Sequence, residues 1–257
     1  MPGAGYYVVL SMLKVLSVAL LGLMPVAAVA QDVDWDSLDE DQINEITGSI
    51  TTDLYHEMGH ALIDIMDLPV LGNEEDAADI MSVFLINSLW EDEWAQQVMR
   101  ASLATWAAIA DSRGEGEPNW WDVHGPDKKR IATMACLFYG ASPDTRGDFA
   151  ADLAIPEDRA GSCPEEYAQI EESWGGFFQQ LVDAGAGETM VWEEPKEETP
   201  LTDAMKEEVD YFNSILTLPS ELVVRVAPCG QANAFYDSSD QSVTICSESA
   251  QQVIDRL

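Results

Sequence analysis

The chain has 257 residues and a formal net charge of −35, from 47 Asp and Glu residues against 12 Lys and Arg residues. A surface this acidic repels phosphate backbones and anionic lipids, which argues against nucleic acids and membrane surfaces as partners. It does not identify a substrate, because an acidic shell also keeps an exported protein soluble. Hydrophobic residues make up 47% of the chain and aromatic residues 9%, enough for a packed core.

The first 30 residues have the features of a cleavable secretory signal peptide. Lys14 precedes an apolar run over residues 15–30 that ends in the small-residue sequence AVA. The alternative is an uncleaved membrane anchor, but this run contains Pro25 and is shorter than the roughly 20 residues that a span needs. We therefore predict cleavage after Ala30, a secreted or periplasmic protein without stable membrane insertion, and one domain over residues 31–257.

The four cysteines are expected to form disulfides, because an even number in an exported chain is typical of an oxidising compartment. None of them has the CxxC spacing of a thiolate metal site. Three pairings are possible. We favour Cys136–Cys163 and Cys229–Cys246, because each pair lies within one local segment.

The elements expected in the first half of the chain are helical. A polar stretch over residues 32–50 precedes a helix over residues 53–67, whose start Thr51, Thr52 or Asp53 can cap. After a short loop, Asn73 is a good N-cap for a second helix, which runs to about residue 90. Further helices are predicted over residues 92–110, 128–140, 164–183 and 201–216, with loops at residues 111–127, 141–162 and 184–200.

The C-terminal region has the composition of β-strands. The segments ELVVRVAPCG and QSVTICSES are rich in β-branched residues, and QANAFYDSSD between them is expected to form a turn. This pattern predicts a small β-hairpin near the C-terminus, formed by a pair of strands that Cys229–Cys246 would staple. The whole chain is thus predicted to be α+β and predominantly α-helical.

His56 and His60, two of the three histidines, lie four residues apart with Glu57 between them. On a helix, residues i and i+4 face the same side about 6 Å apart, so both imidazoles can bind one ion. The HExxH spacing thus supplies two nitrogen ligands, a position for water and a carboxylate that accepts its proton. It predicts a site for one Zn²⁺ with Glu57 as general base. The alternative is a helix that carries two surface histidines.

A catalytic zinc site needs a third protein ligand, and the second predicted helix offers Glu75. Two antiparallel helices joined by a short loop can bring Glu75 onto the ion. Asp79, one turn later, can accept the free N–H of a ligand histidine. Glu74 and Asp76 could compete for the ligand role, but neither has an acid four residues later. The alternative is an acid-rich helix start that complements the helix dipole, which leaves Asp79 unexplained.

The pattern His56-Glu57-x-x-His60 followed by Glu75-x-x-x-Asp79 resembles the gluzincin metallopeptidases. The longer string YHEMGHALIDIMDLPVLGNEEDAAD is similar to a bacterial family of putative metallopeptidases of unknown function. The stretches HGPDKKRIATMACLFYG, PEDRAGSCPEEY and CGQANAFYDSSDQSVTIC fit that family too, so the resemblance covers most of residues 53–250.

This resemblance implies a zincin-like core, with zinc bound by His56, His60 and Glu75 and with Glu57 as base. It departs at residues 129–130, where the family usually has Gln-Arg and this chain has Lys-Arg. Only the arginine carries over. The resemblance does not imply a particular substrate.

The remaining histidine, His124, lies in a loop beside two tryptophans. In gluzincin-type sites a donor from a later segment stabilises the negative charge that develops on the substrate carbonyl oxygen. His124, Arg130 or Tyr139 could serve. We favour His124 as a catalytic residue, and the sequence leaves the choice between His124 and Arg130 open. The alternative is a structural histidine packed in an aromatic loop.

Together these features predict an exported, zinc-dependent peptidase that cleaves a peptide or protein substrate. The alternative is a non-catalytic, zinc-containing secreted binding protein with a degenerate peptidase fold, although a structural site does not require Glu57. Hydrolysis of other amide bonds is a third alternative. The sequence leaves the specificity, the choice between endo- and exopeptidase activity, and the oligomeric state open.

Overall fold

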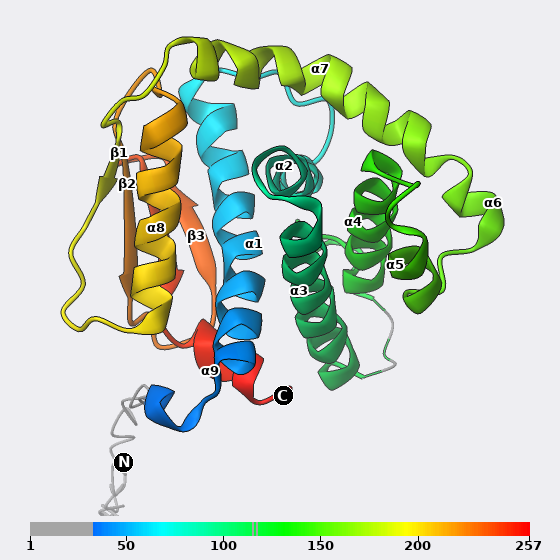
Figure 1. Cartoon of the computed structure of the whole chain (residues 1–257), viewed down its shortest axis with the longest axis horizontal. Coiled ribbons are helices and arrows are strands. Elements are labelled where there is room, and N and C mark those ends of the chain that lie inside the picture. The colour runs from blue at the N-terminus through cyan, green and yellow to red at the C-terminus, as the bar shows by residue number, and fades with distance from the viewer. Residues whose placement is uncertain (1–32, 115, 117) are drawn as a thin grey trace, which may run out of the picture.

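The computed structural model describes residues 33–257 except 115 and 117, so the predicted signal peptide lies outside the described residues. The long helix α1 (Glu40–Ile65) runs through the middle of the molecule (Figure 1). Helices α2 to α4 lie on one side of it, and the small sheet and α8 (Pro200–Ile215) lie on the other. The prediction of an α+β, predominantly helical fold is confirmed.

Helix α1 begins at Glu40, so the prediction that residues 32–50 are a polar stretch ahead of the helix was wrong. A capping box starts the helix: the Asp39 carboxylate accepts a hydrogen bond from the backbone of Gln42, whose side chain accepts one from the backbone of Asp39. In the described part of the chain before it, residues 33–39, there is one short 3₁₀ turn (Trp35–Ser37). Ile46 and Ile50 are fully buried along its inner face. The stretch is therefore an amphipathic helix, whose apolar periodicity is obscured in the sequence by the many acids on its outer face.

The other long helices match their predicted ranges to within a few residues. They are α2 (Glu74–Leu89), α3 (Asp92–Ser112), α4 (Asp127–Ala141) and α7 (Cys163–Asp183). In Figure 1, α2 is seen nearly end-on while α1 lies in the plane. The two helices therefore cross steeply, and the antiparallel arrangement that the sequence suggested was wrong. Gly59 makes the close crossing possible, because a Cβ atom there would lie 2.9 Å from Cα of Ala78.

Two short helices, α5 (Gly147–Asp152) and α6 (Glu157–Ala160), occupy the connection that was predicted as a loop. Buried Arg146 holds this connection to the core, since its guanidinium donates to the Phe138 carbonyl and, at 2.7 Å, to Asp92. Both favoured disulfides, Cys136–Cys163 and Cys229–Cys246, are confirmed.

The strands form one four-stranded sheet in the order β1-β2-β4-β3, and α9 (Ser249–Ile254) follows it. The strands are β1 (Met190–Trp192), β2 (Leu222–Ala227), β3 (Ala234–Asp237) and β4 (Ser242–Cys246). A hairpin is present, but it consists of β3 and β4, whereas β2 pairs with β4 in parallel. The segment predicted as a turn therefore contains β3, because a parallel pair needs a crossover longer than a turn. This places β3 at the edge of the sheet, where it packs beside α1.

Helices and sheet share one main hydrophobic core, to which α1 contributes Leu54, Met58 and Leu62 and the sheet contributes Val224 and Ile245. Among the described residues, no helix is both long and apolar enough to span a bilayer.

The crossing of α1 and α2 generates a first prediction. Gly59→Ala should lower the free energy of unfolding by about 1–3 kcal/mol, because the added methyl group meets the backbone of α2. Thermal unfolding followed by circular dichroism would measure this. Gly175→Ala in α7 is the matched control, since a Cβ there has open space, and it should leave the protein equally or slightly more stable. Equal losses in both variants would contradict the assigned role of the crossing.

Candidate metal centre

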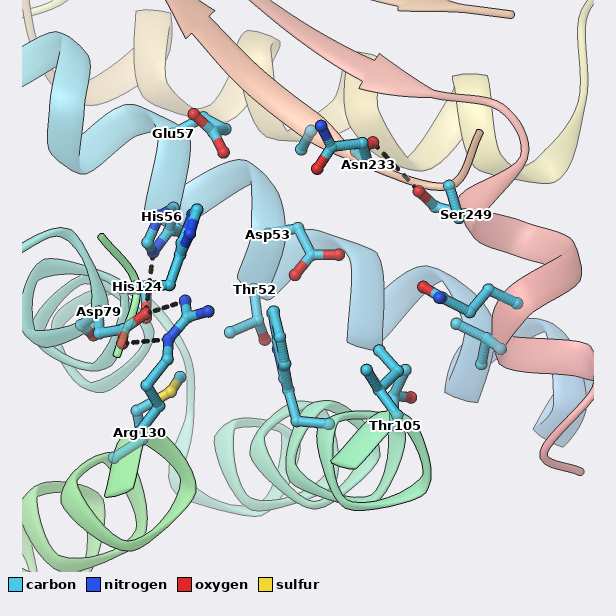
Figure 2. A pocket seen from close by; sticks show the side chains of 18 of the residues that line it. Thr52, Asp53, His56, Glu57, Asp79, Thr105, His124, Arg130, Asn233 and Ser249 are labelled. Atoms are coloured by element: carbon cyan, nitrogen blue, oxygen red, sulfur yellow. Dashed lines mark hydrogen bonds and ion pairs between the residues drawn. The ribbon is translucent and has the colours of Figure 1, made fainter. Parts of the chain in front are cut away.

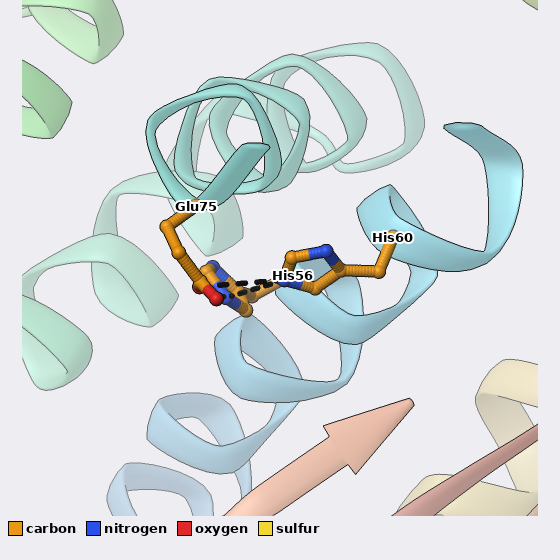
Figure 3. Close-up of side chains that lie close together, drawn as sticks. All are labelled: His56, His60 and Glu75. Atoms are coloured by element: carbon orange, nitrogen blue, oxygen red, sulfur yellow. Dashed lines mark hydrogen bonds and ion pairs between the residues drawn. The ribbon is translucent and has the colours of Figure 1, made fainter. Parts of the chain in front are cut away.

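Three potential ligand atoms converge where α1 crosses the first turn of α2 (Figure 3). His56 Nε2 lies 3.2 Å from Glu75 Oε2, His60 Nε2 lies 3.4 Å from the same oxygen, and the two Nε2 atoms are 3.3 Å apart. The structure thus brings together the residues predicted as metal ligands.

The Nδ1 atoms of the two histidines, which we call the outer nitrogens, each contact a carboxylate of their own. His56 Nδ1 lies 2.9 Å from Asp79, and His60 Nδ1 lies 2.8 Å from Glu74. A carboxylate accepts hydrogen bonds, so Nδ1 carries the proton of each neutral ring and the Nε2 lone pairs point toward one another. Two facing lone pairs beside a carboxylate oxygen repel one another unless a proton or a metal ion lies between them.

The spacing of these atoms fits such a cation. Two ligand atoms that each lie about 2.05 Å from one ion at the tetrahedral angle are about 3.3 Å apart. The three distances in the cluster, 3.2, 3.3 and 3.4 Å, agree with this value. The His56–His60–Glu75 group can therefore hold one metal ion.

Each acid at the start of α2 has its own partner. Glu74 contacts His60, Glu75 faces the two Nε2 atoms, and Asp76 accepts a 2.6 Å bond from Lys129. A favourable helix dipole alone would not require these separate pairings. Sequence reasoning treated Glu74 only as a competing ligand and missed its contact with His60. The signal was available, because two ligand histidines need two Nδ1 partners and Asp79 could supply only one.

Asp79 and Arg130 form a buried, two-pronged ion pair. Arg130 Nε and Nη2 donate to the two Asp79 oxygens at 2.7 and 2.6 Å, and the side chains are only 6% and 5% exposed. The guanidinium also stacks 4.4 Å from the centre of the Trp106 ring. Burial disfavours the charged carboxylate, but the hydrogen bonds from Arg130 and His56 outweigh it and lower the pKa of Asp79. Arg130 is therefore committed to holding Asp79 against His56.

The imidazole of His56 has a strongly shifted pKa without a metal ion. Burial favours the neutral ring, but hydrogen bonds to Asp79 and Glu75 outweigh burial and raise its pKa to about 9. Hydrogen bonds from His56 and His60 lower the pKa of Glu75 well below its ordinary value. A metal ion must therefore displace a proton from this cluster at neutral pH.

Glu57 lies beside the cluster and is 7% exposed. Burial raises its pKa above the ordinary value for glutamate, while His56, His60 and the backbone amide of Tyr236 in β3 lower it in part. A buried carboxylate with a raised pKa is suited to accept and return a proton near neutral pH.

His124 reaches the same carboxylate from the loop before α4. Its Nε2 lies 3.2 Å from Glu75 Oε2, and its Nδ1 lies 3.2 Å from Asp122. The Asn73 side chain, which caps α2, also donates to the backbone carbonyl of Val123 and so ties this loop to the site. His124 does not belong to the set of ligand atoms that all lie within 4.8 Å of one another. It is thus adjacent to the cluster but distinct from it.

Two cavities meet at the cluster. The first, which we call the cleft, has a volume of about 660 Å³ and lies between α1, the start of α2 and β3. The second, which we call the chamber, has a volume of about 150 Å³ and lies between α1, α3, α4 and α9 (Figure 2). Both are lined by Glu57, His124, Asn233 and Ala234. The chamber is also lined by Asp53, which sequence reasoning considered only as a helix cap.

A family profile described as "Putative metallopeptidase" matches residues 25–178 and 193–257. The match includes α1, α2, the His124 loop, α4 and β3, and leaves out only the end of α7 and β1 within its span. Neither the curated proteins nor the solved structures contain a match to the chain.

The contacts of the outer nitrogens predict how metal affinity responds to mutation. Asp79→Asn should weaken Zn²⁺ binding by about 10–100-fold. A neutral amide accepts a weaker hydrogen bond from His56 Nδ1 than a carboxylate does, so the ring would be less well oriented and less basic as a metal ligand. Competition with a chromophoric chelator would measure the affinity. Glu74→Gln should act in the same direction at an exposed position where folding is not at risk. Asp76→Asn is the control, and an equal effect of all three substitutions would contradict the assignment.

The raised pKa of His56 predicts a pH dependence of the metal-free protein. Protonation of His56 stabilises the fold fully below its unfolded pKa of 6.5, and this contribution is lost as the pH rises to about 9. Zn²⁺ should therefore bind at pH 7.5 with release of a proton from His56. Calorimetry in buffers of different ionisation enthalpy would count the protons. Binding without proton release at this pH would contradict the prediction.

Proposed function

The chain belongs to the family described as putative metallopeptidases, and on this premise we propose that residues 31–257 form an exported, zinc-dependent peptidase. One observation carries the proposal: three ligand atoms lie at tetrahedral spacing beside the buried carboxylate of Glu57. A purely structural metal site would have no use for that carboxylate.

His56, His60 and Glu75 would hold one Zn²⁺ ion, a ligand set typical of catalytic zinc sites. When bound, zinc lowers the pKa of a water molecule to about 7 and polarises a carbonyl group. Asp79 and Glu74 keep the two imidazoles in the tautomer that points Nε2 to the ion. Arg130 in turn fixes Asp79.

Glu57 is the general base in this proposal. Its carboxylate takes a proton from the attacking water and delivers it to the nitrogen of the leaving amine. His124 lies beside the site on the loop before α4. Its ring N–H would donate to the carbonyl oxygen of the substrate as negative charge develops there. Arg130 is a weaker candidate for that role, because it is buried in short bonds to Asp79, whereas the contacts of His124 are longer and its side chain is 47% exposed.

The shape beside the cluster supports a peptide substrate. The cleft runs along β3, which is one of the two edge strands of the sheet. An edge strand can pair with an extended peptide through backbone hydrogen bonds, which would lay a peptide bond across the metal site.

Export is supported by the two disulfides, which indicate an oxidising environment. Cleavage of the leader after Ala30 would deliver residues 31–257 to the periplasm or the exterior. The acidic surface then keeps the mature protein soluble.

Glu57→Gln tests the proposed base. The variant should bind Zn²⁺ with unchanged stoichiometry, because Glu57 is not a ligand, and should lose peptide hydrolysis by at least about 10²–10⁴-fold. Cleavage of a protein digest followed by mass spectrometry would measure activity, and elemental analysis would measure zinc. Asp41→Asn, an exposed acid on the same helix, is the control. Hydrolysis that survives in Glu57→Gln would exclude Glu57 as the base, and zinc-loaded wild-type protein without any hydrolysis would contradict the peptidase.

A further inference from the structure

The chamber beside the metal centre contains a carboxylate that the proposed mechanism does not use. Asp53 lies on α1 one turn before His56 and Glu57, and its side chain points into the chamber (Figure 2). Among the described residues, no hydrogen-bond donor and no cation is paired with this carboxylate. Burial raises the pKa of Asp53 to about 7, and the positive charges of His56 and Arg130 oppose this shift only in part.

The two arginines that line the chamber are engaged elsewhere, and so are its two histidines, which contact Glu75. Arg130 gives its donors to Asp79. Arg113 donates to both oxygens of Asp127 at 2.7 and 2.8 Å. Neither arginine is therefore free to neutralise Asp53, although both line the same cavity.

The hydroxyl groups of the chamber are also arranged as acceptors. Each of the four donates its proton to a backbone carbonyl, which leaves oxygen lone pairs for anything that enters the cavity. The four bonds are Thr52 to Gly48 at 3.5 Å, Ser82 to Asp79 at 2.7 Å, Thr105 to Ala101 at 3.0 Å, and Ser249 to Asn233 at 3.1 Å. Thr105 also accepts a 2.9 Å bond from Ser49, but hydroxyl lone pairs remain on all four residues. Beside an unpaired carboxylate, these lone pairs favour a cationic guest and disfavour an anionic one.

We propose that the chamber binds a positively charged group of the substrate, an ammonium or a guanidinium, with Asp53 as its counter-ion. The proposal rests on the peptidase function proposed above, because the chamber and the cleft meet at Glu57. A group that sits in the chamber therefore belongs to a residue next to the bond that is cleaved. The volume of about 150 Å³ suits one such group, since cavities of about this size hold a benzene-sized molecule.

The same charge can come from two places in a peptide. A lysine or arginine side chain next to the scissile bond would make Asp53 a determinant of side-chain specificity. A free α-amino group would make it the anchor of an aminopeptidase. Three pentapeptide amides separate these sources: acetylated Ala-Ala-Lys-Ala-Ala, the same peptide with norleucine in place of lysine, and the norleucine peptide with a free N-terminus.

Binding of these peptides to zinc-loaded Glu57→Gln, measured by isothermal titration calorimetry, tests the proposal without turnover. At least one charged peptide should bind about 10–100-fold more tightly than the acetylated norleucine peptide, as expected for a charge-assisted hydrogen bond. Adding Asp53→Asn should reduce this ratio to about 1, and Asp53→Glu should restore part of it. Zinc content and thermal stability, measured in parallel, show that the variants are folded and loaded.

Asp41→Asn is the matched control, because it removes the same charge from an exposed position on the same helix. It should leave the ratio unchanged. Equal affinities for all three peptides would overturn the cation site, as would equal effects of Asp53→Asn and Asp41→Asn, since the acidity of the whole surface would then explain the preference.

Hydrolysis by the wild-type protein separates this proposal from the peptidase itself. Charge-selective binding that depends on Asp53, without hydrolysis of any peptide, would overturn the peptidase and support the cation site. Hydrolysis that depends on Glu57 but shows no preference for a charged peptide would support the peptidase and overturn the cation site.

Discussion

The close crossing of α1 and α2 is the contact on which the rest of the site depends. Gly59 on α1 leaves no side chain between the helices, so the backbone of α2 at Ala78 can come within van der Waals distance. His60 and Asp79 directly follow Gly59 and Ala78 at this crossing, and His56 and Glu75 lie about one turn before them on each helix. A wider crossing would separate the imidazoles from Glu74, Glu75 and Asp79 together, because one rigid helix carries all three acids.

One of the few cations in the chain lies buried beside this crossing. The whole chain has only 12 Lys and Arg residues for 47 Asp and Glu residues. Arg130 is nevertheless buried, where it pairs with Asp79 alone. A buried pair of this kind adds little stability compared with apolar packing. Its value lies in orientation, because Asp79 fixes the His56 ring and Trp106 fixes the guanidinium.

Much of the site could be predicted from sequence because it consists of short spacings on helices. The i, i+4 pairs His56–His60 and Glu75–Asp79 converge as their spacing indicates. The start of α1 could not be read from hydrophobic periodicity, because the acids on its outer face obscured the buried Ile46 and Ile50, although the Asp39–Gln42 capping box marked it. The parallel pairing of β2 and β4 depends on contacts between segments far apart, and composition carries no information about such partners. For the same reason Asp53 was overlooked: its importance comes from the α3 and α9 walls opposite it.

The second disulfide, Cys229–Cys246, closes part of the wall of both cavities. Cys229 and Cys246 close the segment that carries Asn233, Ala234 and β3, which line both the cleft and the chamber. Before oxidation, this segment is held by noncovalent contacts alone: β3 has one neighbour in the sheet, packs against α1, and donates a hydrogen bond from Tyr236 to Asp64. The helices can assemble the metal ligands without it, but the far wall of both cavities is covalently held only after the thiols have been oxidised. If the chain is the exported peptidase proposed above, oxidation of Cys229 and Cys246 would complete the wall that faces the substrate only after arrival in an oxidising compartment.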